Sequence, residues 1–359
     1  MKFAPVNFET IAAKAGVSKM TVSRALRGET NVSPATRERI RKIATQAGYQ
    51  PNPLLAIYQS QVRASRAPSY QATIAWVNDK ADREYWRRTP YNKGLLLGAR
   101  AQAESLGYRL DEIWLEEMDE TDAAKNIQRF ARVLHARGIH GCILPLGNPA
   151  HAYADWKDFS VAVIGMVHDA AARANSPVMP DAAEHHKASF DYFANVRIAC
   201  EKLRSLGYRR IGFLLCSWLD IHTDKLYRGS FLAQQMDWPR TEHIPICTAD
   251  SPNKTPPAGL EKWLDKHRPD AVLCSKADTK DWLIKLGRQI PDDLGLAHLY
   301  LAEDVKDWSG INPGLAEVGA AAVDLVVQQL KLNQRGVPAR FHELFVTGKW
   351  SSGNTTRKL

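Results

Sequence analysis

The chain has 359 residues, which is too long for one small domain and suits two or three. Hydrophobic residues make up 45% and charged residues 24%, a composition that excludes wholesale disorder. No apolar run approaches the roughly 18 residues of a membrane span, and the opening MKFAPVNFE lacks the apolar run of a signal peptide. The five cysteines are widely spaced and form no Cys-x-x-Cys pair, which argues against a disulfide framework or a zinc site. We therefore expect a cytoplasmic protein.

The net charge of +9 is concentrated at one end of the chain. Residues 1–66 contain eleven Lys and Arg but only three acidic residues, a local charge of +8, and the remaining residues carry only +1. A small basic segment on a nearly neutral body predicts a polyanion-binding module joined to another kind of domain. The alternative is a solvated basic tail, which the regular patterning of the segment disfavours.

The basic segment contains three short helical patterns in succession. The spacing predicts a helix over 8–15 with Thr10 as its N-cap, broken at Gly16, where a left-handed residue is needed. A second helix is expected over 18–28 and a third over 33–49, each beginning at a serine cap. Two capped helices joined by a tight glycine turn predict a helix-turn-helix.

The second of these helices is the one expected to enter the major groove of DNA. Ala12 is small enough for a close helix crossing, and Val22 fills the contact between the first two helices. The side chains expected at base edges are Lys19, Met20 and Arg24. Those expected at backbone phosphates are Thr21, Ser23 and Asn31, although Thr21 and Ser23 also fit a simple solvated helix surface.

The run TIAAKAGVSKMTVSRALRGETNVSPATRERIRKIATQAGYQPNP resembles the DNA-binding head of the lactose/galactose repressor (LacI/GalR) family. The resemblance rests on its A-G-V-S-x-x-T-V-S-R core, its V-S-x-x-T-R-x-x-I third helix and its G-Y-x-P-N close. It implies that a hinge helix and linker follow over 53–70, with Leu54, Leu55 and Tyr58 at the minor groove. Tyr58 stands where the family usually has a leucine, so packing against the linker or the body is an equal alternative.

From residue 71 onward, strand-like runs alternate with helical stretches, which predicts parallel sheets covered by helices. Strands are expected over 73–77, 108–115, 141–146, 161–167, 210–215, 244–247, 271–275 and 294–301. Two internal echoes suggest paired halves: ESLGYRL at 104–110 with RSLGYRR at 204–210, and RGIHGCIL at 137–144 with HRPDAVLC at 267–274. Local mimicry between helix-to-strand turns is the alternative.

Two such halves resemble the body of the same repressor family, which is similar to periplasmic sugar-binding proteins. The expected architecture is an all-α helix-turn-helix head, residues 1–52, and an α/β body of two Rossmann-like lobes, residues 71–359. Lobe 1 is expected at about 71–185 and 312–340, and lobe 2 at about 186–311 with the C-terminal tail. The resemblance implies a transcriptional regulator, acting as a repressor, that binds a pseudo-palindromic operator in double-stranded DNA as a homodimer.

The same resemblance implies a small-molecule effector, a carbohydrate, bound between the lobes. Ligands of Rossmann-like folds bind at strand carboxyl ends, and the candidates there are Asp79, Trp86, Trp218, Asp220, Arg228, Lys276, Asp278 and Tyr300. For each, a solvated loop residue is the plain alternative. The family's usual Asn-Asp pair is replaced by Lys276-Ala277-Asp278, which weakens the case for an ordinary hexose. Lys276 and Arg228 would suit an acidic sugar derivative, and a nucleobase is the second candidate.

The sequence contains few residues in patterns typical of an enzyme active site. It contains no G-x-x-x-x-G-K-[ST], G-x-G-x-x-G, H-E-x-x-H or G-x-S-x-G motif, so we expect no enzyme activity, cofactor or metal. Adjacent His185 and His186 would point about 100° apart on a helix and so rarely chelate one ion. The open alternatives are a regulator with a degenerate pocket controlled by a protein partner, and a sugar-acting enzyme of α/β fold.

Overall fold

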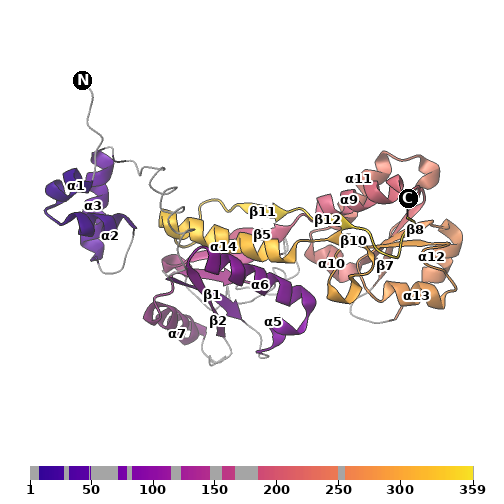
Figure 1. The fold of residues 1–359 in the computed structure, drawn as a ribbon, viewed down its shortest axis with the longest axis horizontal. Helices are drawn as coiled ribbons and strands as arrows, with labels where there is room; N and C mark the ends of the chain where they lie inside the picture. Colours follow the sequence, from indigo (N-terminus) through magenta and orange to yellow (C-terminus); the bar gives the residue numbers. More distant parts are fainter. Residues whose placement is uncertain are drawn as a thin grey trace, which may run out of the picture.

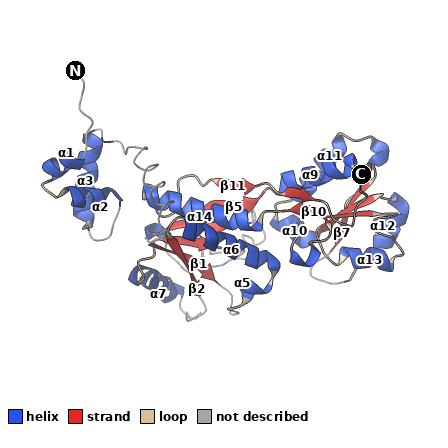
Figure 2. Cartoon of the chain, in the orientation of Figure 1, coloured by secondary structure: helices blue, strands red, loops and turns tan. Residues whose placement is uncertain are grey.

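The computed structural model contains a small helical head and two larger α/β lobes (Figures 1 and 2). Figure 1 draws the head in indigo, and the chain then passes through one lobe, enters the second and returns. The structure describes residues 8–27, 32–47, 49, 72–78, 83–114, 123–145, 156–165, 185–249 and 255–358. The fold class expected from the sequence is confirmed.

The head consists of three helices around a core of its own. These are α1 (Phe8–Ala15), α2 (Lys19–Arg27) and α3 (Pro34–Gln46). The core is built from small and branched side chains of the three helices and of Val32, which lies between α2 and α3: Ile11, Ala12, Ala15, Val22, Ala25, Val32, Ile40 and Ala44. The predicted roles of Ala12 and Val22 in the contact between α1 and α2 are therefore confirmed. Thr10 as an N-cap is wrong, because α1 begins at Phe8 and contains Thr10.

Lobe 1 is built on a parallel sheet of strand order β11-β5-β4-β3-β1-β2. Its strands are β1 (Ala72–Asn78), β2 (Tyr108–Trp114), β3 (Gly141–Leu144), β4 (Ser160–Ile164), β5 (His186–Phe190) and β11 (Glu343–Val346). Its helical elements are α5 (Tyr85–Arg88), α6 (Pro90–Ser105), α7 (Ala123–Ala136), η2 (Trp156–Asp158) and α14 (Leu315–Leu332).

Lobe 2 repeats this plan with strand order β12-β10-β9-β8-β6-β7, in which β12 alone is antiparallel to its neighbour. Its strands are β6 (Ile211–Cys216), β7 (Cys247–Ala249), β8 (Ala271–Cys274), β9 (Gly295–His298), β10 (Ser309–Asn312) and β12 (Lys349–Ser351). Its helical elements are α9 (Tyr192–Ser205), α10 (Ser217–His222), α11 (Leu226–Met236), η4 (Arg240–Glu242), α12 (Leu260–His267), α13 (Thr279–Lys285) and η5 (Glu303–Val305).

Two helices from opposite ends of the body sequence, α6 and α14, pack against each other on one face of the lobe 1 sheet (Figure 1). Their backbones approach closely because glycine occupies the crossing. A Cβ at Gly98 would lie 2.1 Å from the carbonyl oxygen of Ala316, and one at Gly319 would lie 2.0 Å from that of Leu95. The contact therefore excludes any larger residue at either glycine.

The boundary expected between the lobes at residue 186 needs correction. His186–Phe190 pairs with β4 in the lobe 1 sheet, and Glu343–Val346 returns to the same sheet beside it. Both strands are polar at their start, and Lys187 is buried in an ion pair with Glu343, with 3.4 Å between Nζ and Oε1. A strand carrying a buried lysine lacks the apolar run that identifies a parallel strand in a sequence.

The two sequence echoes have different structural meanings. The strands that follow 137–140 and 267–270 are β3 and β8, which occupy equivalent places in the two strand orders. The strands after Gly107 and Gly207 are β2, at a sheet edge, and β6, in a sheet interior, which are not equivalent. Both glycines have positive φ, 79° and 90°, so that echo reflects a shared helix C-cap.

Candidate functional site

The first candidate site is the turn and second helix of the head. Gly16 adopts φ 64°, and the N–H of Val17 donates to the carbonyl of Ala12 at 3.1 Å, which closes α1 in a Schellman arrangement. Ser18 then caps α2, because the N–H of Thr21 donates to its Oγ at 3.1 Å. The turn therefore fixes the direction of α2 relative to α1.

The first turn of α2 presents the side chains predicted to read bases. Met20 is 61% exposed, so its apolar side chain is accessible to a partner surface. Lys19 is also exposed, and its Nζ lies 2.6 Å from a carboxylate oxygen of Glu9. An exposed pair of this kind is weak in water, so the ammonium remains available to a stronger anion. No acidic residue stands in the first turn of α2.

The remaining head candidates are more enclosed. The hydroxyl of Thr21 lies 2.9 Å from that of Ser18, so it forms part of the helix cap. Ser23 and Arg24 lie within one turn of Thr21 along α2, and both are partly buried. Asn31 and the hinge residues Leu54, Leu55 and Tyr58 lie outside the described residues.

The second candidate site is the junction between the two lobes. The chain crosses there three times, from β5 to α9, from β10 to α14 and from β11 to β12. Because β5 and β10 each leave their sheet toward the other lobe, and their neighbours run parallel to them, the carboxyl ends of both sheets face this junction. That is the edge at which ligands of such sheets bind.

Two of the predicted effector residues form an ion pair beside this edge. Asp220, in α10 directly after β6, is 3% exposed. Its Oδ2 accepts from Nε of Arg228 at 2.9 Å, and Nη2 of the same guanidinium lies 2.6 Å from it. The structure thus brings Asp220 and Arg228 together, with the guanidinium still partly exposed.

Trp218 and Lys276 make local contacts. The Trp218 ring stacks on that of His222, with 4.0 Å between centroids, and stays 48% exposed. Nζ of Lys276 lies 5.3 Å from the centroid of the Trp282 ring. Asp278 stands at the start of α13 and makes no side-chain cap bond there.

Tyr300 is the predicted residue that joins the lobes. Its ring lies 6.1 Å, edge-on, from that of Tyr91 in α6, and Tyr91 in turn packs on Phe190. Asp79 lies outside the described residues, as does the side chain of Trp86, whose backbone belongs to α5. Of the eight predicted effector residues, Asp220 and Arg228 are thus paired directly with each other.

Sequence reasoning missed several polar groups at this junction. Asn78, the last residue of β1, is fully buried, and neither atom of its amide has a hydrogen-bond partner among the described residues. Tyr192 and Tyr227 pack edge to face at 5.2 Å, and burial raises the pKa of both phenols far above the usual range. The signal for Asn78 was available, because a polar residue ends the apolar run ATIAWV.

Within the described part of the chain, no group of three or more His, Cys, Asp or Glu side chains is arranged to hold a metal ion. Among the same residues, no helix combines the length and apolar character needed to cross a bilayer.

Comparison with known proteins bears on the head first. Residues 8–52 match the profile of the family described as "Bacterial regulatory proteins, lacI family". Over these residues, the head of the chain is similar to the lacI family. The resemblance stated from the sequence motifs of the head is therefore confirmed.

The chain is also similar to named transcriptional regulators. It is 32% identical over 103 residues to the HTH-type transcriptional regulator CelR of Thermobifida fusca, an alignment covering 28% of this chain and 27% of that relative. The chain thus spans about a quarter of that curated relative. It is 25% identical over 345 residues to the HTH-type transcriptional regulator TreR of Salmonella typhimurium, covering 93% of this chain and 96% of the relative.

Solved structures show the same fold. A transcriptional regulator CelR–cellobiose complex matches with a TM-score of 0.52 and 19% identity, covering 98% of this chain and 99% of that one. The lac repressor dimer bound to operator and the anti-inducer ONPF matches with a TM-score of 0.52 and 17% identity, covering 98% and 99%. At these identities the likeness establishes the fold of this chain and nothing further.

Proposed function

We propose that this protein is a sequence-specific transcriptional regulator, acting as a repressor, that binds a pseudo-palindromic operator in double-stranded DNA as a homodimer. The observation that carries the proposal is the capped helix α2, which presents exposed Lys19 and Met20 from a basic head. One head reads few base pairs, and symmetric readers place two heads on two half-sites. Such a regulator works in the cytoplasm.

Within the head, base-edge contacts are assigned to Lys19, Met20 and Arg24. Lysine and arginine donate to guanine O6 and N7, and methionine offers an apolar contact to the thymine methyl group. Backbone phosphate contacts are assigned to Thr21, Ser23 and Asn31. Leu54, Leu55 and Tyr58 are assigned to the minor groove at the operator centre, on the resemblance of the head alone.

The preferred duplex can be selected from a random pool with the full chain. Replacing Arg24 with Ala should then weaken binding to the selected duplex by about 1–3 kcal/mol and relax the preference at one position of each half-site. Replacing Lys262 with Ala in α12 is the matched control, because it removes an exposed cation of lobe 2. A selection that returns no consensus, or that favours single strands, would refute the proposal.

The second part of the proposal is control by a small molecule at the junction between the lobes. The carboxyl ends of both sheets face that junction, and Asp220, Arg228, the buried amide of Asn78 and the Tyr91–Tyr300 contact surround it. A ligand that prefers one arrangement of the lobes must change DNA affinity by its differential affinity for the two arrangements. A sugar or sugar derivative is the proposed class, which agrees with the cellobiose in the CelR complex of the same fold.

The effector part is tested on the selected duplex. DNA affinity is measured with neutral sugars, sugar acids and nucleobases present in turn, and Arg228→Ala should abolish the response to the active compound. If none of these compounds alters DNA affinity but a protein from the same cells does, the partner-controlled alternative is favoured. Turnover of a sugar by the purified chain would favour the enzyme alternative.

A further inference from the structure

An acidic residue accompanies the exposed first turn of α2. Glu9 stands in the first turn of α1, and one of its carboxylate oxygens lies 2.6 Å from Nζ of Lys19 at the start of α2. Both side chains are mostly exposed, Lys19 to 60% and Glu9 to 67%. The ammonium expected at a base edge is therefore accompanied by a carboxylate at the same exposed end of the helix pair.

Glu9 is one of few negative charges in a basic segment. Residues 1–66 carry eleven Lys and Arg but only three acids, Glu9, Glu29 and Glu38. In a helix-turn-helix the first helix crosses the DNA backbone while the second enters the major groove. A carboxylate on α1 beside the first turn of α2 then lies near phosphates, which repel it. An offsetting contact is available from a hydrogen-bond donor, and the donors of the major groove are the amino groups of bases.

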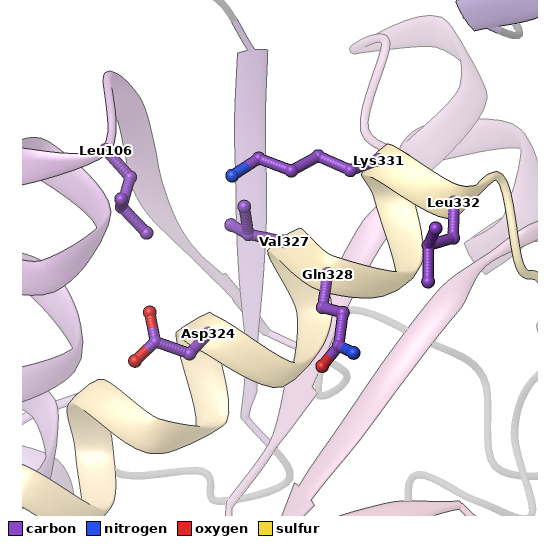
Figure 3. Close-up of a pocket in the computed structure, with 6 residues that line it drawn as sticks. All are labelled: Leu106, Asp324, Val327, Gln328, Lys331 and Leu332. Carbon is purple, nitrogen blue, oxygen red and sulfur yellow. The ribbon is translucent and has the colours of Figure 1, made fainter. Parts of the chain in front are cut away.

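The contact between Glu9 and Lys19 is not a general consequence of surface charge. Asp324 and Lys331 of α14 share a shallow hollow of lobe 1, but their charged ends lie apart (Figure 3). Asp324 accepts instead from Nε2 of Gln102 at 2.6 Å. Because an acid and a base that line one hollow need not meet, the pairing of Glu9 with Lys19 reflects the placement of α1 against α2.

Side by side, the two groups match the major-groove edge of a G·C base pair. That edge offers the acceptors N7 and O6 of guanine next to the amino donor N4 of cytosine. Lys19 is able to donate to N7 and O6, while Glu9 accepts from N4 of the paired cytosine. An A·T pair instead places its amino donor between two acceptors, N7 and O4. Since an exposed ion pair is weak in water, opening the pair onto the base edge costs little.

We propose that Glu9 is a specificity-determining residue, and that Lys19 and Glu9 together read one G·C base pair in each half-site. The inference rests on the proposed function and adds a hydrogen-bond acceptor and the base pair that it recognises. On sequences without an amino donor at that position, the carboxylate stays unpaired beside phosphates and weakens binding. Glu9 therefore raises the ratio of specific to non-specific affinity.

The test repeats the selection of duplexes from a random pool with full-length Glu9→Gln protein. Glutamine is close in size, carries no charge and pairs best with adenine N6 and N7, so one G·C position of each half-site should change to A·T or lose its preference. Affinity for the duplex selected by wild type should fall at least about five-fold. Affinity for a scrambled duplex should rise at least about two-fold, because one carboxylate no longer repels phosphates.

Glu38→Gln is the matched control, because it removes the same charge from an exposed position of α3 in the same head. It should alter the affinity for both duplexes alike and keep every preferred base. Urea unfolding should be close to equal in the two variants, because an exposed ion pair contributes little to stability. A Glu9→Gln protein with the consensus and affinities of Glu38→Gln would overturn the assignment and leave the proposed function intact.

A second variant tests whether the two side chains read the same base pair. Lys19→Ala should lose its preference at the position that changes in Glu9→Gln. Changes at two different positions would overturn the joint reading, since they would assign Lys19 and Glu9 to separate base pairs. A wild-type chain whose own selection returns no consensus would instead refute the proposed function.

Discussion

The guanidinium of Arg228 contacts the buried carboxylate of Asp220 through one oxygen only. Nε and Nη2 lie 2.9 Å and 2.6 Å from Oδ2, while Oδ1 is buried and has no hydrogen-bond partner among the described residues. Asp220 therefore orients an arginine that still has donors to offer. This geometry suits a side chain that must be held in place while it binds something else.

Replacing Asp220 with Ala should destabilise the protein by about 1–3 kcal/mol, the cost typical of leaving a polar partner unsatisfied. The loss should stay below that of a fully buried ion pair, because the Arg228 side chain is 40% exposed and can be hydrated. Urea unfolding measures the change, with Asp281→Ala on the exposed face of α13 as the control. A loss equal to that of the control would mean that the pair contributes nothing to the fold.

The glycine crossing of α6 and α14 predicts opposite effects for the same substitution at two helix positions. Gly98→Ala should destabilise by about 1–3 kcal/mol, because its Cβ would meet the Ala316 backbone. Gly229→Ala in α11 should stabilise by about 0.5–1 kcal/mol, because nothing lies within 4 Å of the added methyl and alanine is the better helix former. Thermal unfolding of both variants is the measurement, and equal shifts would contradict the packing described.

The cap of α2 should stabilise the head alone. Ser18→Ala removes the acceptor for the N–H of Thr21, which should cost about 1 kcal/mol of local stability. Hydrogen exchange of the α2 amides should become faster by about five-fold, while exchange in the lobes stays the same. Thr10→Ala is the control, because Thr10 lies inside α1 and is not its cap. If the exchange rate of the α2 amides is unchanged in Ser18→Ala, Ser18 does not stabilise α2 as its cap.

His186 should make the stability of lobe 1 depend on pH. Its Nδ1 accepts from the N–H of His342 at 2.9 Å, which requires a neutral ring. Burial, and then the charge of His342, lower the pKa of His186 below its usual value of about 6.5. The folded state therefore binds fewer protons, so this contribution is complete above about pH 6.5 and is lost as pH falls toward the lowered pKa.

The comparison of His186→Gln with wild type isolates that contribution. Glutamine keeps an acceptor for the His342 N–H but does not titrate, so the variant should lose less stability between pH 7 and pH 5. Urea unfolding at several pH values measures the difference between the two proteins. Parallel stability curves over this range would contradict the role given to His186.

The head could be predicted from the sequence almost residue by residue, because its determinants are local. Ser18 and Ser33 are caps, and Gly16 adopts the positive φ expected of a turn glycine. The first predicted cap failed because Phe8 packs on the head core and extends α1 toward the N-terminus. Local capping rules do not include that tertiary contact.

The fold class of the body could be predicted from the sequence, but four of its strands could not. Strands β5, β10, β11 and β12 escaped prediction because they are short or carry polar side chains whose partners are distant in sequence, as with Lys187 and Glu343. The expected strands over 244–247 and 294–301 are in fact Cys247–Ala249 and Gly295–His298. The candidate residues chosen at strand ends omitted Asn78, although the end of the apolar run ATIAWV signals it. They also omitted Tyr91, whose contact with Tyr300 only the packing of the lobes reveals.

The affinity of the full chain for its selected duplex, relative to a scrambled duplex of equal length and composition, tests the central claim most directly. Both are measured by fluorescence anisotropy at about 150 mM salt, because the head charge of +8 makes any affinity strongly salt-dependent. The account predicts that two chains bind the selected duplex at least about 1,000-fold more tightly than the scrambled one. Affinities within about ten-fold of each other would show a basic head that binds DNA without reading it.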